Sequence, residues 1–229
     1  MVQLRAAAAR DFAAGGVTTP ISQLRSSLTL ARLEYDTRDQ HTAAEADRFR
    51  VLDEPTRAGY QRFLASVFAF EYAIECKLVY VMGLSARFVA TSLRTGLLGQ
   101  DLLALGDHGP VLSIFARPVE RPRFRDVLEA LGWIYVMQRN MLHHGALYLA
   151  LAPRLRPTLQ TASRYLTCHV SDVYLRWHEL GAQLDAAATT AERANEIVEA
   201  ARYAFERQHA WFVETRTAPT IEVARSRRV

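Results

Sequence analysis

A histidine on an otherwise small and apolar helix face is the first feature of this chain that suggests chemistry. Between Ser27 and Asp47, side chains of this kind recur at intervals of three and four residues: Leu30, Leu33, Thr37, His41 and Ala44. The spacing predicts one long helix that carries all of them on a single face. A neutral imidazole there can ligate a metal or a haem iron. A partly buried histidine that hydrogen-bonds a neighbour is the alternative interpretation.

Other chemistries find less support in the sequence. No Gly-rich phosphate loop, nucleophile elbow or zinc-binding spacing occurs. A carboxylate-bridged di-iron bundle requires two Glu-x-x-His pairs and two further glutamates. Only Glu206 and His209 form such a pair, so this kind of site is not expected.

The composition favours a helical protein of one domain. The 229 residues include only 8 Pro and 11 Gly, and Ala, Leu and Arg are plentiful, which suits helices. We expect an all-α fold, with residues 1–20 as a poorly ordered lead-in, 21–217 as the domain and 218–229 as a basic tail. Ser22 or Ser26 is a possible cap for the first helix.

Apolar spacing predicts further helices along the chain. One runs from Thr56 to Met82, with Pro55 in its first turn and Asp53 as a possible cap. A second ends at Gly106, and residues 107–123 are predicted to be largely loop. The segment 124–151 is expected to end at Pro153 and Pro157, followed by helices over 158–183 and 190–215. The inward side chains of the 158–183 helix are predicted to include Val170, Val173, Tyr174 and Trp177.

Four ordered blocks of sequence resemble the bacterial haem oxygenases. They are Thr37-Arg38-Asp39-Gln40-His41-Thr42-Ala43-Ala44-Glu45, Gly59-Tyr60-Gln61-Arg62-Phe63-Leu64, the Asp101–Gly106 segment, and Ile197-Val198-Glu199-Ala200-Ala201-Arg202-Tyr203-Ala204-Phe205. The resemblance implies a single-domain haem oxygenase-like helical bundle. It also implies that His41 is the proximal ligand of haem b, with Glu45 one turn further on and Phe205 lining the pocket.

The segment that would face the haem from the other side departs from the family. There the family reads roughly G-x-x-Y-V-x-x-G-x-x-L-G, with glycines that leave room for haem and oxygen. Aligned on Tyr135, this chain has Arg139 and His143 at glycine positions, and Gly145 comes two residues late.

Three consequences of this departure are possible. His143 is a second axial ligand, or the helix shifts so that Gly145 takes over, or the haem pocket is closed. A solvated pair near a helix bend is the alternative for His143 and His144, because adjacent helical residues do not share a face.

The resemblance suggests roles for two more residues. It places Asn140 where a polar residue holds distal water, and Arg176 where a basic residue holds a haem propionate. A surface arginine is the alternative interpretation of Arg176.

The resemblance thus predicts a protein that binds haem as cofactor and substrate through His41. If active, it would use electrons from a ferredoxin or flavin reductase to cleave haem to biliverdin, carbon monoxide and iron. Two alternatives are a non-catalytic haem-binding or sensing protein that uses both His41 and His143, and a haem-free protein that acts through protein contacts.

Charge and composition narrow the expected partners and location. The net charge of +4 is modest, and nucleic-acid binding is not expected without a dense basic stripe. No stretch has the roughly 20 apolar residues of a membrane span. Cys76 and Cys168 are read as reduced thiols in a cytoplasmic protein, which is expected to be a monomer or homodimer.

Overall fold

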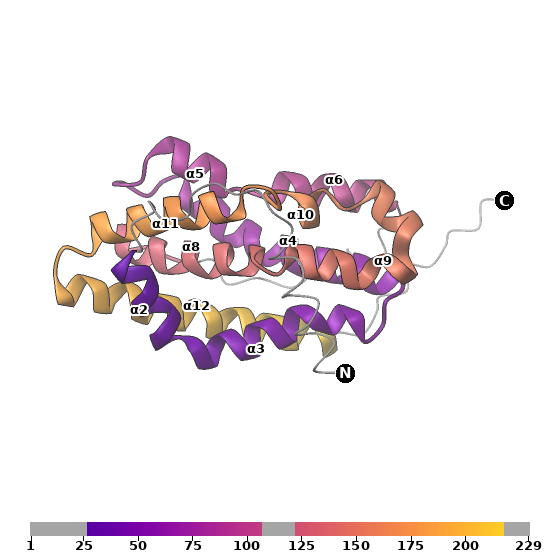
Figure 1. The fold of residues 1–229 in the computed structure, drawn as a ribbon, viewed down its shortest axis with the longest axis horizontal. Helices are drawn as coiled ribbons and strands as arrows, with labels where there is room; N and C mark the ends of the chain where they lie inside the picture. Colours follow the sequence, from indigo (N-terminus) through magenta and orange to yellow (C-terminus); the bar gives the residue numbers. More distant parts are fainter. Residues whose placement is uncertain (1–26, 107–121, 218–229) are drawn as a thin grey trace.

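The computed structural model describes residues 27–106 and 122–217, and within these ranges every regular element is a helix (Figure 1). The predicted all-α class is therefore confirmed. The lead-in over 1–20, the candidate caps Ser22 and Ser26, and the basic tail over 218–229 lie outside the described residues.

The helix expected to run unbroken from Ser27 to Asp47 is in fact two helices. They are α2 (Leu28–Asp36) and α3 (Arg38–Phe49), followed by the short 3-10 helix η2 (Arg50–Leu52). The break falls at Thr37, whose hydroxyl donates to the Leu33 carbonyl oxygen at 2.7 Å. Such back-bonding bends helices, and Thr37 has φ −116° and ψ 16°. Ser27 caps α2 by accepting from the Leu30 amide.

The next helices follow the sequence pattern more closely. Helix α4 (Arg57–Leu78) is capped by Thr56, not Asp53, because the Thr56 hydroxyl accepts from the Gly59 amide. Helices α5 (Ala86–Ser92) and α6 (Thr95–Leu105) come next. Helix α6 stops, as predicted, at Gly106, whose φ of +82° suits a residue without a side chain. Most of the predicted loop over 107–123 lies outside the described residues.

The segment predicted to be one helix over 124–151 is also divided. Helix α8 (Val127–Met141) ends before Leu142 and His143, and α9 (His144–Thr161) begins directly after them. The prediction that Pro153 and Pro157 end the segment was wrong. Both lie inside α9, where the chain accommodates them by a kink at Leu155.

The C-terminal half of the bundle consists of α10 (Arg164–Thr167), α11 (Val173–Ala187) and α12 (Ala191–Thr217). The single helix expected over 158–183 is thus interrupted between Thr161 and Arg164 and again between Thr167 and Val173. Tyr174, predicted to face inward, is 70% exposed. The last predicted helix is confirmed as α12. Among the described helices, none is both long and apolar enough to cross a membrane.

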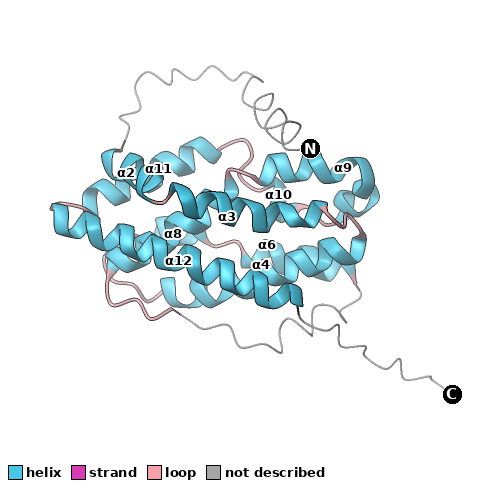
Figure 2. Ribbon diagram, turned by 90° about the horizontal axis from the view of Figure 1, so that it is seen from below, coloured by secondary structure: helices cyan, strands magenta, loops and turns pink. Residues whose placement is uncertain are grey.

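Helix α12 packs against the two helices that carry His41 and Tyr135. Both α3 and α8 pack against it (Figure 2). Gly132 permits the closest approach of α8 to α12. A Cβ at this position would lie 2.7 Å from the Ala200 Cβ and from the Ala201 amide nitrogen. Gly132 therefore serves the packing of α8 on α12.

We predict that Gly132→Ala destabilises the protein by about 1–3 kcal/mol, the usual cost of overpacking a tight core. The added methyl would meet backbone atoms of α12 that cannot move aside locally. Urea denaturation of both proteins measures the difference.

Gly99→Ala is the matched control for this substitution. Its Cβ would meet only the Phe68 ring, at an ordinary 3.6 Å. Because alanine favours a helix over glycine, this variant should be as stable as the wild type or more stable. Equal stability of Gly132→Ala and the wild type would contradict the packing argument.

Candidate functional site

The imidazole of His41 lies between α3 and α8, where it is held by two hydroxyl groups. Its Nε2 is 2.8 Å from the Thr37 Oγ1 and 2.8 Å from the Tyr135 hydroxyl oxygen. One neutral ring nitrogen offers either a hydrogen or a lone pair, so the two oxygens compete for it. When Tyr135 donates, it uses the lone pair that a metal would otherwise take.

Aromatic rings surround this contact. The Phe205 ring of α12 meets the His41 ring edge-on, with centroids 5.3 Å apart. The Tyr135 ring lies between Phe205 and Trp177 of α11, at centroid distances of 6.1 and 5.7 Å. Three of the residues selected from the sequence, His41, Tyr135 and Phe205, are therefore brought together.

A second group of selected residues lies one to two turns further along the same two helices. The Arg139 Nη1 is 3.4 Å from the His143 Nε2, and the His143 Nδ1 is 4.0 Å from a carboxylate oxygen of Glu45 on α3. The Phe49 ring packs edge-on against His143 at 5.8 Å. Tyr135 and Arg139 of α8 and His143, which precedes α9, thus follow one another at intervals of four residues next to α3.

Burial and a nearby charge keep both imidazoles neutral. Desolvation, followed by the positive charge of Arg139, lowers the pKa of His41 to about 4. The same two causes, with a contribution from Arg48, lower the pKa of His143 to about 3. Both rings are therefore uncharged at pH 7, the form in which histidine binds metals. Burial also raises the pKa of Tyr135, which keeps its hydroxyl protonated.

Three selected residues lie elsewhere. Asn140 is buried against α12, where its side-chain amide donates to the Gln208 Oε1 at 2.7 Å. Arg176 of α11 forms ion pairs within its own helix, with Asp172 at 3.1 Å and Glu179 at 3.0 Å. Gly145 is in the first turn of α9. The roles suggested for these residues in distal water, propionate binding and helix shift remain predictions.

Sequence reasoning missed two residues of the site. Trp177 was expected to be part of the core, but it contacts the Tyr135 ring. Phe49 was not selected at all. Trp177 lies on α11, and no spacing rule connects it to His41. Phe49 lies on α3 itself, eight residues or about two turns after His41, so helical spacing could have identified it.

Comparison with known proteins supports a family assignment. Residues 27–214 match a protein-family model described as heme oxygenase. A search of curated proteins finds no match. The matched range contains the whole group of residues around His41 and His143.

We predict that Arg139→Gln raises the pKa of both His41 and His143, by roughly one pH unit. The guanidinium is a cause of both depressions, and glutamine retains length and polarity without charge. Titration of the histidine ring signals by NMR gives the two values.

Arg62→Gln is the control, because Arg62 pairs with Glu54 on the surface and should leave both values unchanged. Unchanged values in Arg139→Gln would refute the electrostatic explanation.

Proposed function

Because the chain belongs to the haem oxygenase family, we propose that it binds haem b between α3 and α8, with the Nε2 of His41 as the axial ligand of the iron. The observation that carries this proposal is the neutral imidazole of His41, whose Nε2 faces α8. Haem iron takes such a nitrogen as a proximal ligand in many proteins.

The side chains around His41 suit a haem group. The surrounding rings of Phe205, Tyr135 and Trp177 provide the apolar contacts that a porphyrin requires. The Tyr135 hydroxyl has to leave Nε2 for iron to bind there. The Thr37 hydroxyl donates to the Leu33 carbonyl and can therefore only accept from Nε2, so this contact is also lost when Nε2 binds iron.

The reaction that family membership supports is oxidative cleavage of haem to biliverdin, carbon monoxide and iron, with electrons from a separate donor. In it, haem provides the reactive centre and the protein provides orientation and surroundings. Here His41 would hold the iron, Phe205 would contact the porphyrin beside the His41 ring, and Arg139 would supply a positive charge nearby.

A second candidate function is haem binding without turnover, and three side chains of α8 and of the residues before α9 favour it. Tyr135, Arg139 and His143 are large and all face α3, which reduces the room for oxygen opposite His41. His143 is also neutral, so it is chemically suited to be a second axial ligand. A haem with two histidine ligands has no free position for oxygen.

We predict that His41→Ala weakens haem binding at least tenfold, because the direct bond to iron is lost. Haemin titration followed by absorbance measures this for the wild type, His41→Ala and His143→Ala. His178→Ala, which changes another partly buried histidine on α11, is the control and should bind like the wild type. Equal binding by His41→Ala would refute the proposed ligand, and no binding by any variant would favour a protein that acts through protein contacts.

The same samples separate the two candidate functions. If haem is cleaved, reductant and oxygen should convert the absorbance of the wild-type complex to that of biliverdin, and His143→Ala should react as fast or faster because it opens the oxygen side. If haem is only held, the wild-type spectrum should be low-spin and stable, and should become high-spin in His143→Ala. Retention of the low-spin spectrum in His143→Ala would exclude His143 as the second ligand.

A further inference from the structure

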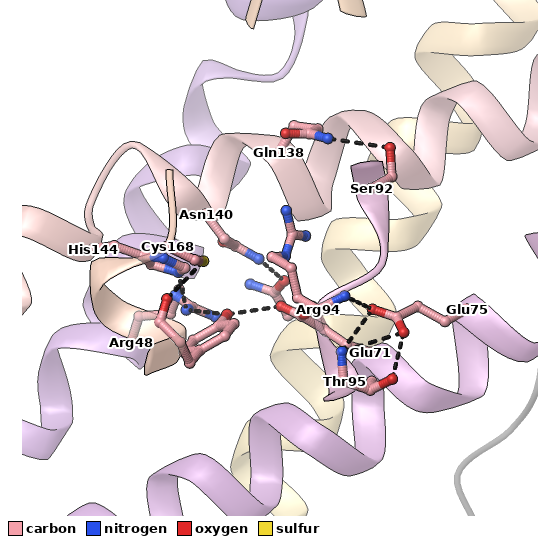
Figure 3. A network of polar contacts seen from close by, with 12 residues as sticks. Arg48, Glu71, Glu75, Ser92, Arg94, Thr95, Gln138, Asn140, His144 and Cys168 are labelled. Atoms are coloured by element: carbon pink, nitrogen blue, oxygen red, sulfur yellow. Dashed lines mark hydrogen bonds and ion pairs between the residues drawn. The ribbon is translucent and has the colours of Figure 1, made fainter. Parts of the chain in front are cut away.

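A buried polar network joins α3, α4, α9, α10 and the segment before α6 (Figure 3). Its centre is Tyr165 of α10, whose hydroxyl donates to Glu71 at 2.8 Å and accepts from the Arg48 Nη2 at 2.9 Å. Arg94, which precedes α6, lies 3.4 Å from Glu71 through its Nε. His144 completes the group, with its Nε2 3.3 Å from the Arg48 Nη2. All of these side chains are at most 1% exposed.

Several nitrogen atoms of this network have no hydrogen-bond partner among the described residues. They are the Arg48 Nε, both terminal nitrogens of Arg94, and the His144 Nδ1. All four are donors. An arginine keeps its hydrogens at any physiological pH, and His144 carries its hydrogen on Nδ1 when Nε2 accepts from Arg48. Buried donors in native proteins are nearly always bonded, so these four require an acceptor.

The charges of the network are also unevenly paired. The two hydrogen-bond partners of Arg48, His144 and Tyr165, are uncharged. The Arg48 Nη2 lies 3.3 Å from the His144 Nε2, and a ring that accepts this hydrogen bond carries no charge to offset the guanidinium. Glu71 is the one carboxylate within ion-pair distance of either guanidinium among the described residues.

The other nearby carboxylate is bound elsewhere. Glu75 accepts from the backbone amides of Arg94 and Thr95 and from the Thr95 hydroxyl. Glu75 therefore bonds the backbone at the start of α6 and makes no hydrogen bond to the terminal nitrogens of Arg94. Figure 3 shows Arg94 in the middle of the group, with Glu75 and Thr95 on one side and Arg48 and His144 on the other.

We propose that Arg48, Arg94 and His144 enclose a binding site for a small monovalent anion such as chloride. The occupant has to accept several hydrogen bonds, and an anion does so without bringing hydrogens of its own that need acceptors. Water brings two. The three side chains are each at most 1% exposed, so a small, monatomic anion suits the position better than a larger one. Its negative charge would offset the guanidinium that lacks a carboxylate.

The site is separate from the proposed haem contact but shares α3 with it. Arg48 follows His41 by seven residues, about two turns of the same helix. An anion bound to Arg48 would tie the end of α3 to α9 and to the segment before α6. We therefore expect it to stabilise the fold whether or not haem binds.

Crystals of the wild-type protein grown in about 0.1 M sodium bromide test the proposal directly, because bromide is recognised by its anomalous scattering. The proposal predicts a bromide peak within hydrogen-bond distance of the Arg94 Nη atoms and the His144 Nδ1. Oxygen density of ordered water there, without an anomalous peak, would overturn it.

Thermal unfolding in solution provides the second test. At constant ionic strength, replacement of gluconate, which is too large for the site, by chloride should raise the melting temperature by about 3–5 °C. Arg94→Lys keeps the charge but removes the two terminal donors, so it should abolish the effect. Arg164→Lys is the matched control at an exposed arginine and should retain it.

Each combination of these results either supports or refutes the anion site. A bromide peak together with a chloride effect that only Arg94→Lys abolishes supports the site. A bromide peak in a protein whose melting temperature ignores chloride would show an adventitious ion only, and the proposal would fall. If Arg94→Lys does not fold, the wild-type crystal and the wild-type chloride titration decide between these outcomes.

Discussion

The close approach of α8 to α12 at Gly132 is the constraint on which the candidate site depends. It fixes the rotation of α8, because only the glycine side of the helix can lie so near the α12 backbone. Tyr135 and Arg139 are then directed to α3, while Asn140 is directed to Gln208 of α12. Helix α3 packs on the same α12. One close helix contact therefore determines which side chains meet His41.

The interior in turn determines the chemical state of the histidines. Desolvation is the largest cause of the lowered pKa of His41, His143 and His144, and neighbouring arginines add to it. All three rings are therefore neutral at pH 7. Unfolding exposes them to water, where a histidine takes up a proton below about pH 6.5. The unfolded state binds more protons, so the stability contributed by these residues is present at neutral pH and lost on acidification.

The sequence predicted those features that depend on local pattern. Apolar spacing identified α4 and α12, and Gly106 identified the end of α6. The face predicted to carry Leu30, Leu33 and His41 does pack against other helices. Local pattern failed where tertiary contacts decide. Thr37 divides α2 from α3 because its hydroxyl bonds the backbone, and α9 accommodates Pro153 and Pro157 by a kink. Gly132 packs closely on α12, which no local pattern indicates, and no sequence spacing connects Arg48, Arg94 and His144.

The two adjacent histidines at the start of α9 lie in two different environments. His143 and His144 are adjacent, so their side chains diverge. His143 faces Glu45 and Phe49 on the His41 side, whereas His144 faces Arg48 and Tyr165. Helix α3 contributes to both groups and is thereby held at two points. The contact through Arg48 does not involve Tyr135. If His41 binds iron as proposed, α3 would therefore lose the Tyr135 hydroxyl at one point and keep its contact at the other.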